Sequence, residues 1–183
     1  MISKTVEFNR VLKKRRMVRS FKDKPVDDSQ VRKLLENAHR APSAGFLQQQ
    51  EFIIIKDGNT KAKLAEAAVG QYFIAQAPVV IVVCSNTDRV VKRYGNRGVN
   101  FYSIIDGAFA SMLILLTVVN EGLAACFVGA FNDDEISKIL KLPKQVKPVG
   151  IIPIGYANEP AEKFERISLE EIVHYERYGQ HKN

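Results

Sequence analysis

The stretch IIDGAFASMLILLTVV, residues 104–119, is apolar all round its circumference when it is drawn as a helix. Gly122 follows it as a stop signal, so we expect a long helix over residues 101–121. The stretch contains Asp106 and is short for a membrane span. A helix of this kind must be buried on all sides. Either the rest of a single chain covers it or it lies in the core of a dimer, and we favour the dimer.

Short strands and helices alternate around this stretch. Apolar runs predict strands at residues 52–55, 79–84, 124–129 and 149–154. The run VVIVVC at 79–84 has no polar position, so it is buried on both faces. Capping residues and prolines predict helices over residues 6–14 after Thr5, from Asp27 to Pro42, from Thr60, from Asn132 to Pro143, and from Ser168 toward Tyr175. Alternation by itself favours a parallel, doubly wound sheet, although it does not fix the strand order.

Length and composition indicate an ordinary globular protein. The chain has 183 residues, of which 46% are hydrophobic and 26% charged, and we expect one domain over residues 1–183. The start, MISK, leads into polar sequence rather than an apolar run, which favours the cytoplasm. Cys84 and Cys126 lie in apolar runs and are expected to be free, buried thiols, with a single disulfide between them as the alternative.

The net charge of +7 comes from the N-terminal part of the chain. Residues 1–40 hold 12 Lys and Arg against 5 Asp and Glu, whereas residues 41–183 hold 15 of each. The densest part is KKRRMVRSF at residues 13–21, where apolar side chains interleave with the cations. Such a cluster suits an anion, most simply a phosphate, because Arg offers a planar fork of donors. A solvated helix face is the alternative, and the pI of about 9.4 also allows a nucleic-acid partner.

The common catalytic and metal-binding patterns are missing from the sequence. The three histidines and two cysteines have no metal-ligand spacing, and no G-x-S-x-G, phosphate-loop or G-x-G-x-x-G motif occurs. Ser43 has no base placed beside it and is a poor nucleophile. We therefore expect no catalytic side chain and no metal, and a reaction that depends on a bound cofactor.

Six segments in chain order resemble the FMN-dependent nitroreductase family in its short form. They begin with RRMVRSF at 15–21 followed by PV at 25–26, and APSAGFLQ at 41–48 running into EFII. The others are AP at 77–78, YSIIDGAFA at 102–110, EGLAACFVGAF at 121–131, and PIGY at 153–156 continuing through Arg166 to HYERYG at 174–179. Each motif alone is weak, but the series covers nearly the whole chain.

The resemblance implies an α+β fold with a mixed, largely antiparallel sheet flanked by helices. It also implies an intertwined homodimer that binds FMN at the subunit interface. The FMN-binding residues that it implies are Arg15, Arg16, Met17, Arg19, Pro42, Ser43, Ala44, Gln48, Gly129, Ala130, Lys163 and Arg166.

These residues divide by role within the resemblance. The arginines, with Lys163, are implied to hold the phosphate and ribityl end, and residues 42–44 with Gln48 are implied to border the flavin ring. Gly129 and Ala130 are implied to bring backbone N–H groups near the reactive side of the ring. Arg93, Tyr94 and Arg97 fall where such enzymes often line or cover the pocket, and a solvated loop is the alternative there.

Two residues depart from the family pattern. Met17 replaces a serine and cannot donate a hydroxyl hydrogen bond to phosphate, and Phe46 replaces an asparagine and cannot bond the polar edge of the ring. Each lost hydrogen bond costs about 0.5–1.5 kcal/mol, which several cation–phosphate contacts outweigh, so FMN is still expected. Phe46 is expected to stack over the ring or narrow the pocket, unless it is simply a core residue.

The resemblance implies an oxidoreductase with ping-pong, two-electron chemistry. NADH or NADPH would be the donor, and a nitroaromatic, a quinone or a similar small molecule the acceptor. A flavin-binding carrier or sensor without turnover is the first alternative. A nucleic-acid-binding module that uses the basic N-terminus is the second, but the charge surplus is confined to one short segment without an aromatic-rich recognition motif. We expect neither a nucleic-acid nor a membrane partner.

Overall fold

A four-stranded antiparallel sheet forms the centre of the protein. The computed structural model describes residues 7–160 and 164–181. Its strands are β1 (Gln50–Ile55), β2 (Val79–Asn86), β3 (Ala124–Ala125) and β4 (Val146–Gly155), in the order β1-β2-β4-β3. Every neighbouring pair is antiparallel, and the parallel pairing found outside the named strands is the bridge between Met17 and Ala125. The α+β class is confirmed, and the parallel sheet favoured by alternation alone is wrong.

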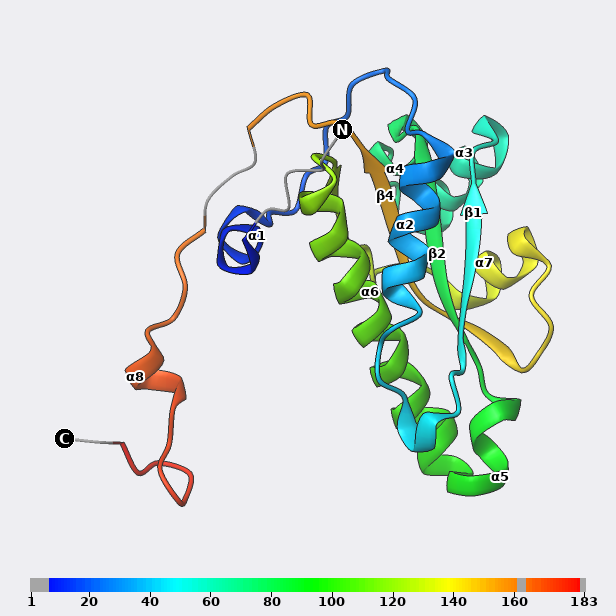
Figure 1. The fold of residues 1–183 in the computed structure, drawn as a ribbon. Helices are drawn as coiled ribbons and strands as arrows, with labels where there is room; N and C mark the ends of the chain where they lie inside the picture. Colours follow the sequence, from blue (N-terminus) through cyan, green and yellow to red (C-terminus); the bar gives the residue numbers. More distant parts are fainter. Residues whose placement is uncertain (1–6, 161–163, 182–183) are drawn as a thin grey trace.

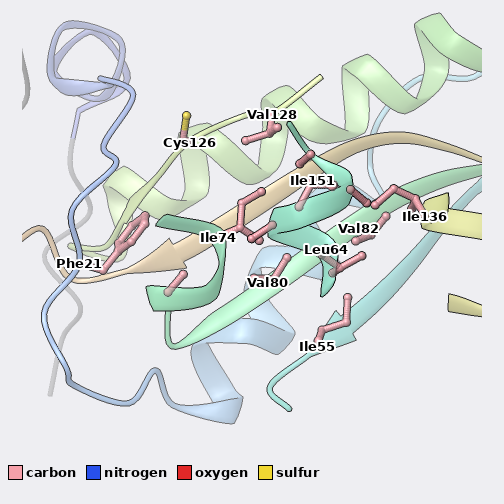
Figure 2. Close-up of a cluster of buried hydrophobic side chains, with 14 of the residues drawn as sticks. Phe21, Ile55, Leu64, Ile74, Val80, Val82, Cys126, Val128, Ile136 and Ile151 are labelled. Carbon is pink, nitrogen blue, oxygen red and sulfur yellow. The ribbon is translucent and has the colours of Figure 1, made fainter. Parts of the chain in front are cut away.

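The strand β2 is buried on both faces, as its sequence predicts. Val80, Val82 and Cys84 belong to one core, with α3 (Gly58–Ala67), α4 (Phe73–Gln76) and α7 (Asp133–Leu140). Figure 2 shows Val80 and Val82 in this cluster. The alternate residues 79, 81 and 83 point into a second core, with α2 (Asp28–Ala38) and α6 (Ser103–Asn120). The sheet is thus the middle of three layers (Figure 1). A strand buried on both faces has the same apolar pattern in a parallel and in an antiparallel sheet. The run at 79–84 therefore could not reveal the direction of the neighbouring strands.

Helix ends follow the capping signals in the sequence. The side chain of Asn132 accepts a hydrogen bond from the N–H of Glu135 at 3.0 Å and starts α7. The helix α3 starts at Gly58 rather than at Thr60, because Asp57 accepts from the N–H of Thr60 at 2.7 Å and so places that residue in the first turn.

Two helices in the N- and C-terminal segments differ in extent from their expected ranges. The helix α1 is Phe8–Lys14, and Thr5 and Val6, the expected start, lie outside the described residues. At the C-terminal end, α8 (Leu169–Ile172) begins after Ser168 as predicted but stops short of Tyr175.

Two further elements differ from the sequence-based expectation. The strand expected over 124–129 is reduced to β3, with a separate bridge between Val128 and Ile151. The basic stretch after β2 forms the helix α5 (Asp88–Arg97), which continues into the π-helical turn η2 (Gly98–Tyr102). Gly95, at φ 53° and ψ −142°, breaks the helical backbone inside α5, and this glycine and the high charge hid the helix from the sequence pattern.

The long helix α6 is confirmed, but one chain does not cover it. One side packs on the sheet and on α2. The other side leaves Ile104, Phe109 and Met112 exposed by 55%, 46% and 48%. The alternative in which a single chain buries the helix all round is therefore wrong. Figure 1 also shows the C-terminal segment with α8 extending away from the sheet and its helices.

By length and composition, the helical stretch Asp88–Asn120 could cross a membrane, but half of its most apolar window is buried, as in the core helix of a globular protein. The two cysteines are free and buried, as expected. Burial, and secondarily the charge of Glu51, raises the pKa of the Cys84 thiol to about 12.

Candidate functional site

The expected phosphate-binding arginines gather around one pocket, which we call the arginine pocket. Its volume is about 290 Å³, and it is lined by Arg15, Arg16, Met17, Arg19, Phe164, Glu165 and Arg166. The extended segment after α1 presents the first four of these side chains, because Met17 bridges to Ala125 and the N–H of Val18 donates to the Ala125 carbonyl at 3.0 Å. The C-terminal segment supplies the other three. Val18 is buried while Met17 and Arg19 are on the surface, as strand alternation requires.

The donors in this pocket are not all engaged within the chain. A terminal nitrogen of Arg15, Nη1, is buried and has no hydrogen-bond partner among residues 7–160 and 164–181. Arg16, by contrast, uses its Nη1 on the backbone carbonyls of Lys13 and Arg15, at 2.8 and 2.9 Å. A buried donor without a partner costs about 1–3 kcal/mol, a cost that an anion in the pocket would remove. The residues present therefore fit a phosphate group.

Met17 and Cys126 also border this region. The Met17 sulfur accepts a hydrogen bond from the N–H of Phe127 at 3.4 Å, so the thioether helps to fix the strand edge in place of a hydroxyl. Burial raises the pKa of the Cys126 thiol, an effect that the charge of Arg19 opposes. The guanidinium of Arg19 also lies 6.0 Å from the ring centre of Phe73.

The loop expected to border the flavin ring is held by Asp106, a residue that the sequence analysis did not assign to the site. Its Oδ2 accepts from the N–H of Ala44 at 2.8 Å and from the side-chain amide of Gln49 at 2.6 Å. Asp106 is 3% exposed, and burial raises the pKa of this carboxyl, while the two hydrogen bonds lower it. The sequence carried a signal for this role, because Asp106 is the one charged residue in an otherwise apolar helix.

A second pocket lies between this loop, α5 and the start of α6, and we call it the tyrosine pocket. Its volume is about 440 Å³, and it is lined by Pro42, Ser43, Ala44, Tyr94, Tyr102, Ile105, Asp106 and Phe109. Ser43 Oγ accepts from the N–H of Gln48 at 2.9 Å, which stabilises the turn. The pocket walls are mainly aromatic and aliphatic, with the loop backbone on one side, and such a slot suits a flat ring.

Three of the remaining expected site residues line neither pocket, and the fourth lies outside the described residues. Gly129 and Ala130 are exposed beyond the bridge at Val128, and the Ala130 carbonyl accepts from Gln71 at 3.2 Å. Gln48 does not line the tyrosine pocket; its carbonyl accepts from Arg89 at 2.6 Å. Lys163 lies outside the described residues.

Phe46 is not a core residue of the single chain. It is 77% exposed and is not part of the tyrosine-pocket lining. The three residues expected either to line the pocket or to lie in a solvated loop belong to the helix α5. Tyr94 lines the tyrosine pocket, and Arg93 donates to the Gly45 carbonyl at 3.3 Å. Arg97 donates to the Tyr102 hydroxyl at 3.1 Å.

The two pockets lie at opposite ends of α6. The tyrosine pocket uses residues 102–109 at the start of the helix. A groove that shares Arg16 with the arginine pocket uses Leu115, Val118 and Val119 near its end. An 18-residue helix is about 27 Å long, so the described part of one chain does not join the two pockets into one site.

Comparison with known proteins matches the sequence of this chain to one family. The family model described as "Nitroreductase family" matches residues 12–72 and 66–156. An "FMN reductase [NAD(P)H]" of Bacillus subtilis is 31% identical over 178 residues, covering 89% of this chain and 71% of the relative. An "NADH dehydrogenase" of Thermus thermophilus is 29% identical over 187 residues, covering 87% of this chain and 91% of the relative.

A solved structure supports the same fold. The NADPH:FMN oxidoreductase of Vibrio harveyi, in complex with NAD⁺, superposes with a TM-score of 0.87 over 96% of this chain and 79% of that one. At 19% identity this match concerns the fold alone. The family model and the relative at 31% identity lead to one conclusion. The chain belongs to the nitroreductase family, a family of oxidoreductase enzymes.

Proposed function

We propose that the protein is an FMN-dependent NAD(P)H oxidoreductase that reduces a small acceptor, such as a nitroaromatic or a quinone, by ping-pong two-electron transfer. The single observation that carries this proposal is the convergence of four arginines on one pocket, where Arg15 Nη1 is buried and finds no partner in the described part of the chain. The name of the Bacillus subtilis relative, an FMN reductase that uses NAD(P)H, supports both the cofactor and the donor.

The arginine pocket would hold the FMN phosphate. A dianionic phosphate in a partly buried site needs several charge-assisted donors, and Arg15, Arg19 and Arg166 offer them without a carboxylate ion pair among the described residues. Lys163 remains a proposed addition to this set. Residues 42–44 would border the flavin ring, and the hydrogen bond from Ala44 to Asp106 would hold this loop in place.

The protein's own groups would then bind, orient and shield the reactants. Bound FMN would supply the two-electron chemistry that connects donor and acceptor. The walls of the tyrosine pocket would stack the donor or acceptor ring and exclude water from it. We assign no proton transfer to a side chain and propose no catalytic residue.

We further propose that the functional unit is a homodimer in the cytoplasm, with residues 1–183 acting as one FMN-binding domain. The two pockets are separated by the length of α6, and the helix exposes an apolar face between them. Packing two copies of α6 in opposite directions about a twofold axis would bring the arginine pocket of each chain toward the tyrosine pocket of the other. Gly129 and Ala130 would approach the ring in that assembly.

Flavin content of arginine variants tests the proposal. Arg19→Ala and Arg166→Ala should each lose flavin on purification, because a charge-assisted contact to phosphate contributes about 1.5–3 kcal/mol. Lys22→Ala removes the same charge from the same segment but lines neither pocket, so it should keep its flavin. Circular dichroism of each variant checks the fold. Full flavin retention in both arginine variants would refute the phosphate assignment.

A second measurement separates turnover from passive binding. Anaerobic addition of NADPH or NADH to the yellow wild-type protein should bleach its absorption near the flavin bands. A flavin-bound protein that does not bleach with either donor would be a carrier or sensor, and the enzymatic part of the proposal would be wrong.

A further inference from the structure

The helix α5 carries a concentration of positive charge beside the tyrosine pocket. Between residues 88 and 97 it has Arg89, Lys92, Arg93 and Arg97 against one acid, Asp88. Arg89 is engaged, because it pairs with Glu51 at 2.5 Å and donates to the loop at Gln48. Within the described ranges, neither Arg93 nor Arg97 forms an ion pair with an acid. Their charges are therefore available to a ligand.

Both arginines lie over aromatic rings in or beside the pocket wall. The guanidinium carbon of Arg97 lies 4.7 Å from the ring centre of Phe101 and 5.4 Å from that of Tyr102. The guanidinium carbon of Arg93 lies 5.4 Å from the ring centre of Tyr94. Tyr94 and Tyr102 meet edge to face at 5.2 Å, so the two cations and their rings form one continuous rim.

Stacking of this kind prepares the arginines to bind an anion. The ring contacts restrict each guanidinium, so less conformational freedom is lost when a ligand binds. Arg97 uses Nε on the Tyr102 hydroxyl, and Arg93 uses Nη1 on the Gly45 carbonyl. A guanidinium has five N–H groups, so most of the donors of each arginine remain for a carboxylate or phosphate.

The pocket inside this rim suits the uncharged part of the same ligand. Tyr94, Tyr102, Ile105 and Phe109 give it aromatic and aliphatic walls. Its one charged lining residue is Asp106, whose Oδ2 already accepts two N–H donors from the loop and Gln49. A flat ring would lie against the face that the tyrosines and Phe109 line, with an attached anionic group at the rim.

We propose that Arg93 and Arg97 form an anion-binding rim on the tyrosine pocket, which selects flat aromatic ligands that carry a carboxylate or phosphate group. This proposal rests on the proposed function, because it takes the tyrosine pocket to be where donor and acceptor enter. It adds the ligand class: anionic ring compounds are preferred over neutral ones of the same shape. The anion is either a carboxylate on the acceptor or a phosphate of the nicotinamide donor.

Equilibrium binding tests the rim without depending on turnover. Calorimetry on the purified protein would compare 4-nitrobenzoate with 4-nitrobenzamide, which match in size and differ in charge. Wild-type protein should bind the benzoate more tightly by about tenfold, or about 1.4 kcal/mol. Arg97→Gln should remove that preference by lowering the benzoate affinity much more than the benzamide affinity. Equal affinities for the two compounds in the wild type, with no preference for NADPH over NADH, would overturn the proposal.

A control on the same helix separates a local contact from the general field of α5. Lys92→Gln removes one charge from α5 at an exposed residue that, among the described residues, makes no contact with the aromatic rings that hold Arg93 and Arg97. It should keep the benzoate preference, and an equal loss in Lys92→Gln and Arg97→Gln would refute the assignment to the stacked arginines. Arg93→Gln also loses the bond to Gly45, so Arg97→Gln, which touches no loop carbonyl, is the decisive variant.

Steady-state rates then identify the source of the anion. If the acceptor supplies it, the ratio of kcat/KM for nitrobenzoate over nitrobenzamide should fall about tenfold in Arg97→Gln. If the donor's extra phosphate supplies it, the ratio for NADPH over NADH should fall instead. Either result supports the rim, and unchanged values of both ratios would refute it. Absence of flavin and of all turnover in the wild type would refute the proposed function but leave the binding comparison intact.

Discussion

Asp106 is the residue on which the loop in the ring-side half of the proposed site depends. It is the one charged side chain in α6, it is almost fully buried, and it accepts hydrogen bonds from both Ala44 and Gln49. The sequence showed an acid in an apolar helix, but the partner is 62 residues away in the chain, and only the packing of α6 beside the loop brings the two together. A helix pattern predicts which face is buried and not which loop covers it.

The burial of Asp106 predicts a pH dependence of stability. Its pKa in the folded protein is raised above the ordinary value of 3.8, so the folded state binds this proton more tightly than the unfolded state does. Stability from this group is therefore greatest below pH 3.8 and falls as the pH rises through the raised pKa. Asp106→Asn, whose amide oxygen can accept the same bonds, removes this dependence.

Urea unfolding across a pH series checks this expectation. Wild-type protein should gain stability relative to Asp106→Asn as the pH is lowered from neutrality toward the ordinary pKa of the acid. The exposed Asp23→Asn serves as the control and should follow the wild type. Parallel curves for wild type and Asp106→Asn would show that the Asp106 carboxyl titrates alike in both states.

Phe46 adopts a backbone conformation that suits another residue. Its φ is 57°, in the left-handed region that asparagine tolerates and phenylalanine rarely adopts, and its ring is 77% exposed. Phe46→Asn should raise the free energy of unfolding by about 0.5–1 kcal/mol, because backbone strain is relieved and little apolar burial is lost. Leu47, at φ −84°, has no such strain, so Leu47→Asn should not stabilise. Thermal unfolding of the flavin-free wild type and of both variants measures these changes in stability. Equal destabilisation in both variants would contradict the strain argument.

At the scale of elements, the sequence predicted which helices and strands exist better than it predicted their lengths or the direction of strand pairing. The run at β2 and the capping residues of α2, α7 and α8 placed the starts of those elements correctly, because burial and capping are local properties. The helix α5 was missed because its charged residues form no broad apolar stripe and Gly95 interrupts it. Strand direction was wrong from alternation alone, since β2 pairs with β1 and β4 through residues distant in the sequence.

The close approach of α6 to β4 gives an element-scale prediction. A Cβ on Gly107 would meet three atoms of the Val149 side chain, at 2.8, 2.9 and 3.1 Å, and one of these is Val149 Cβ, which no rotamer change moves. Alanine improves helix propensity by about 1 kcal/mol, but overpacking costs about 1–3 kcal/mol, so Gly107→Ala should destabilise. The helix would have to move off the strand.

Chemical denaturation measures this change, with Gly58→Ala as the matched control. A Cβ on Gly58, in the first turn of α3, meets nothing within 4 Å. That variant should be neutral or slightly more stable. If Gly107→Ala proved as stable as Gly58→Ala, the packing of α6 on β4 would be looser than the distances indicate.

At the scale of the whole molecule, the two halves of the proposed site lie too far apart in one chain to hold one cofactor. Residues 15–19 and residues 42–44 are close in sequence, yet the fold sends them to opposite ends of α6. No sequence pattern reveals this separation, because it depends on how the chain runs between α1, α2 and the sheet. The exposed apolar side chains of the C-terminal segment, with Phe164 and Leu169 at 77% and 67%, leave a further surface for a second chain to cover.

This separation yields a prediction about assembly and cofactor together. Met112 lies on the exposed face of α6 between the two pockets and lines neither, so Met112→Glu would place a charge in the proposed interface without touching the arginines or the loop. Because the two half-sites would come from different chains, the variant should become monomeric and lose its flavin together. Ile54, on β1 and 45% exposed, is comparable in exposure, and Ile54→Glu should remain a flavin-bound dimer. Sedimentation with detection at the flavin bands follows mass and cofactor at once, and a Met112→Glu monomer that binds flavin as tightly as the wild type would require both halves of the site to come from one chain.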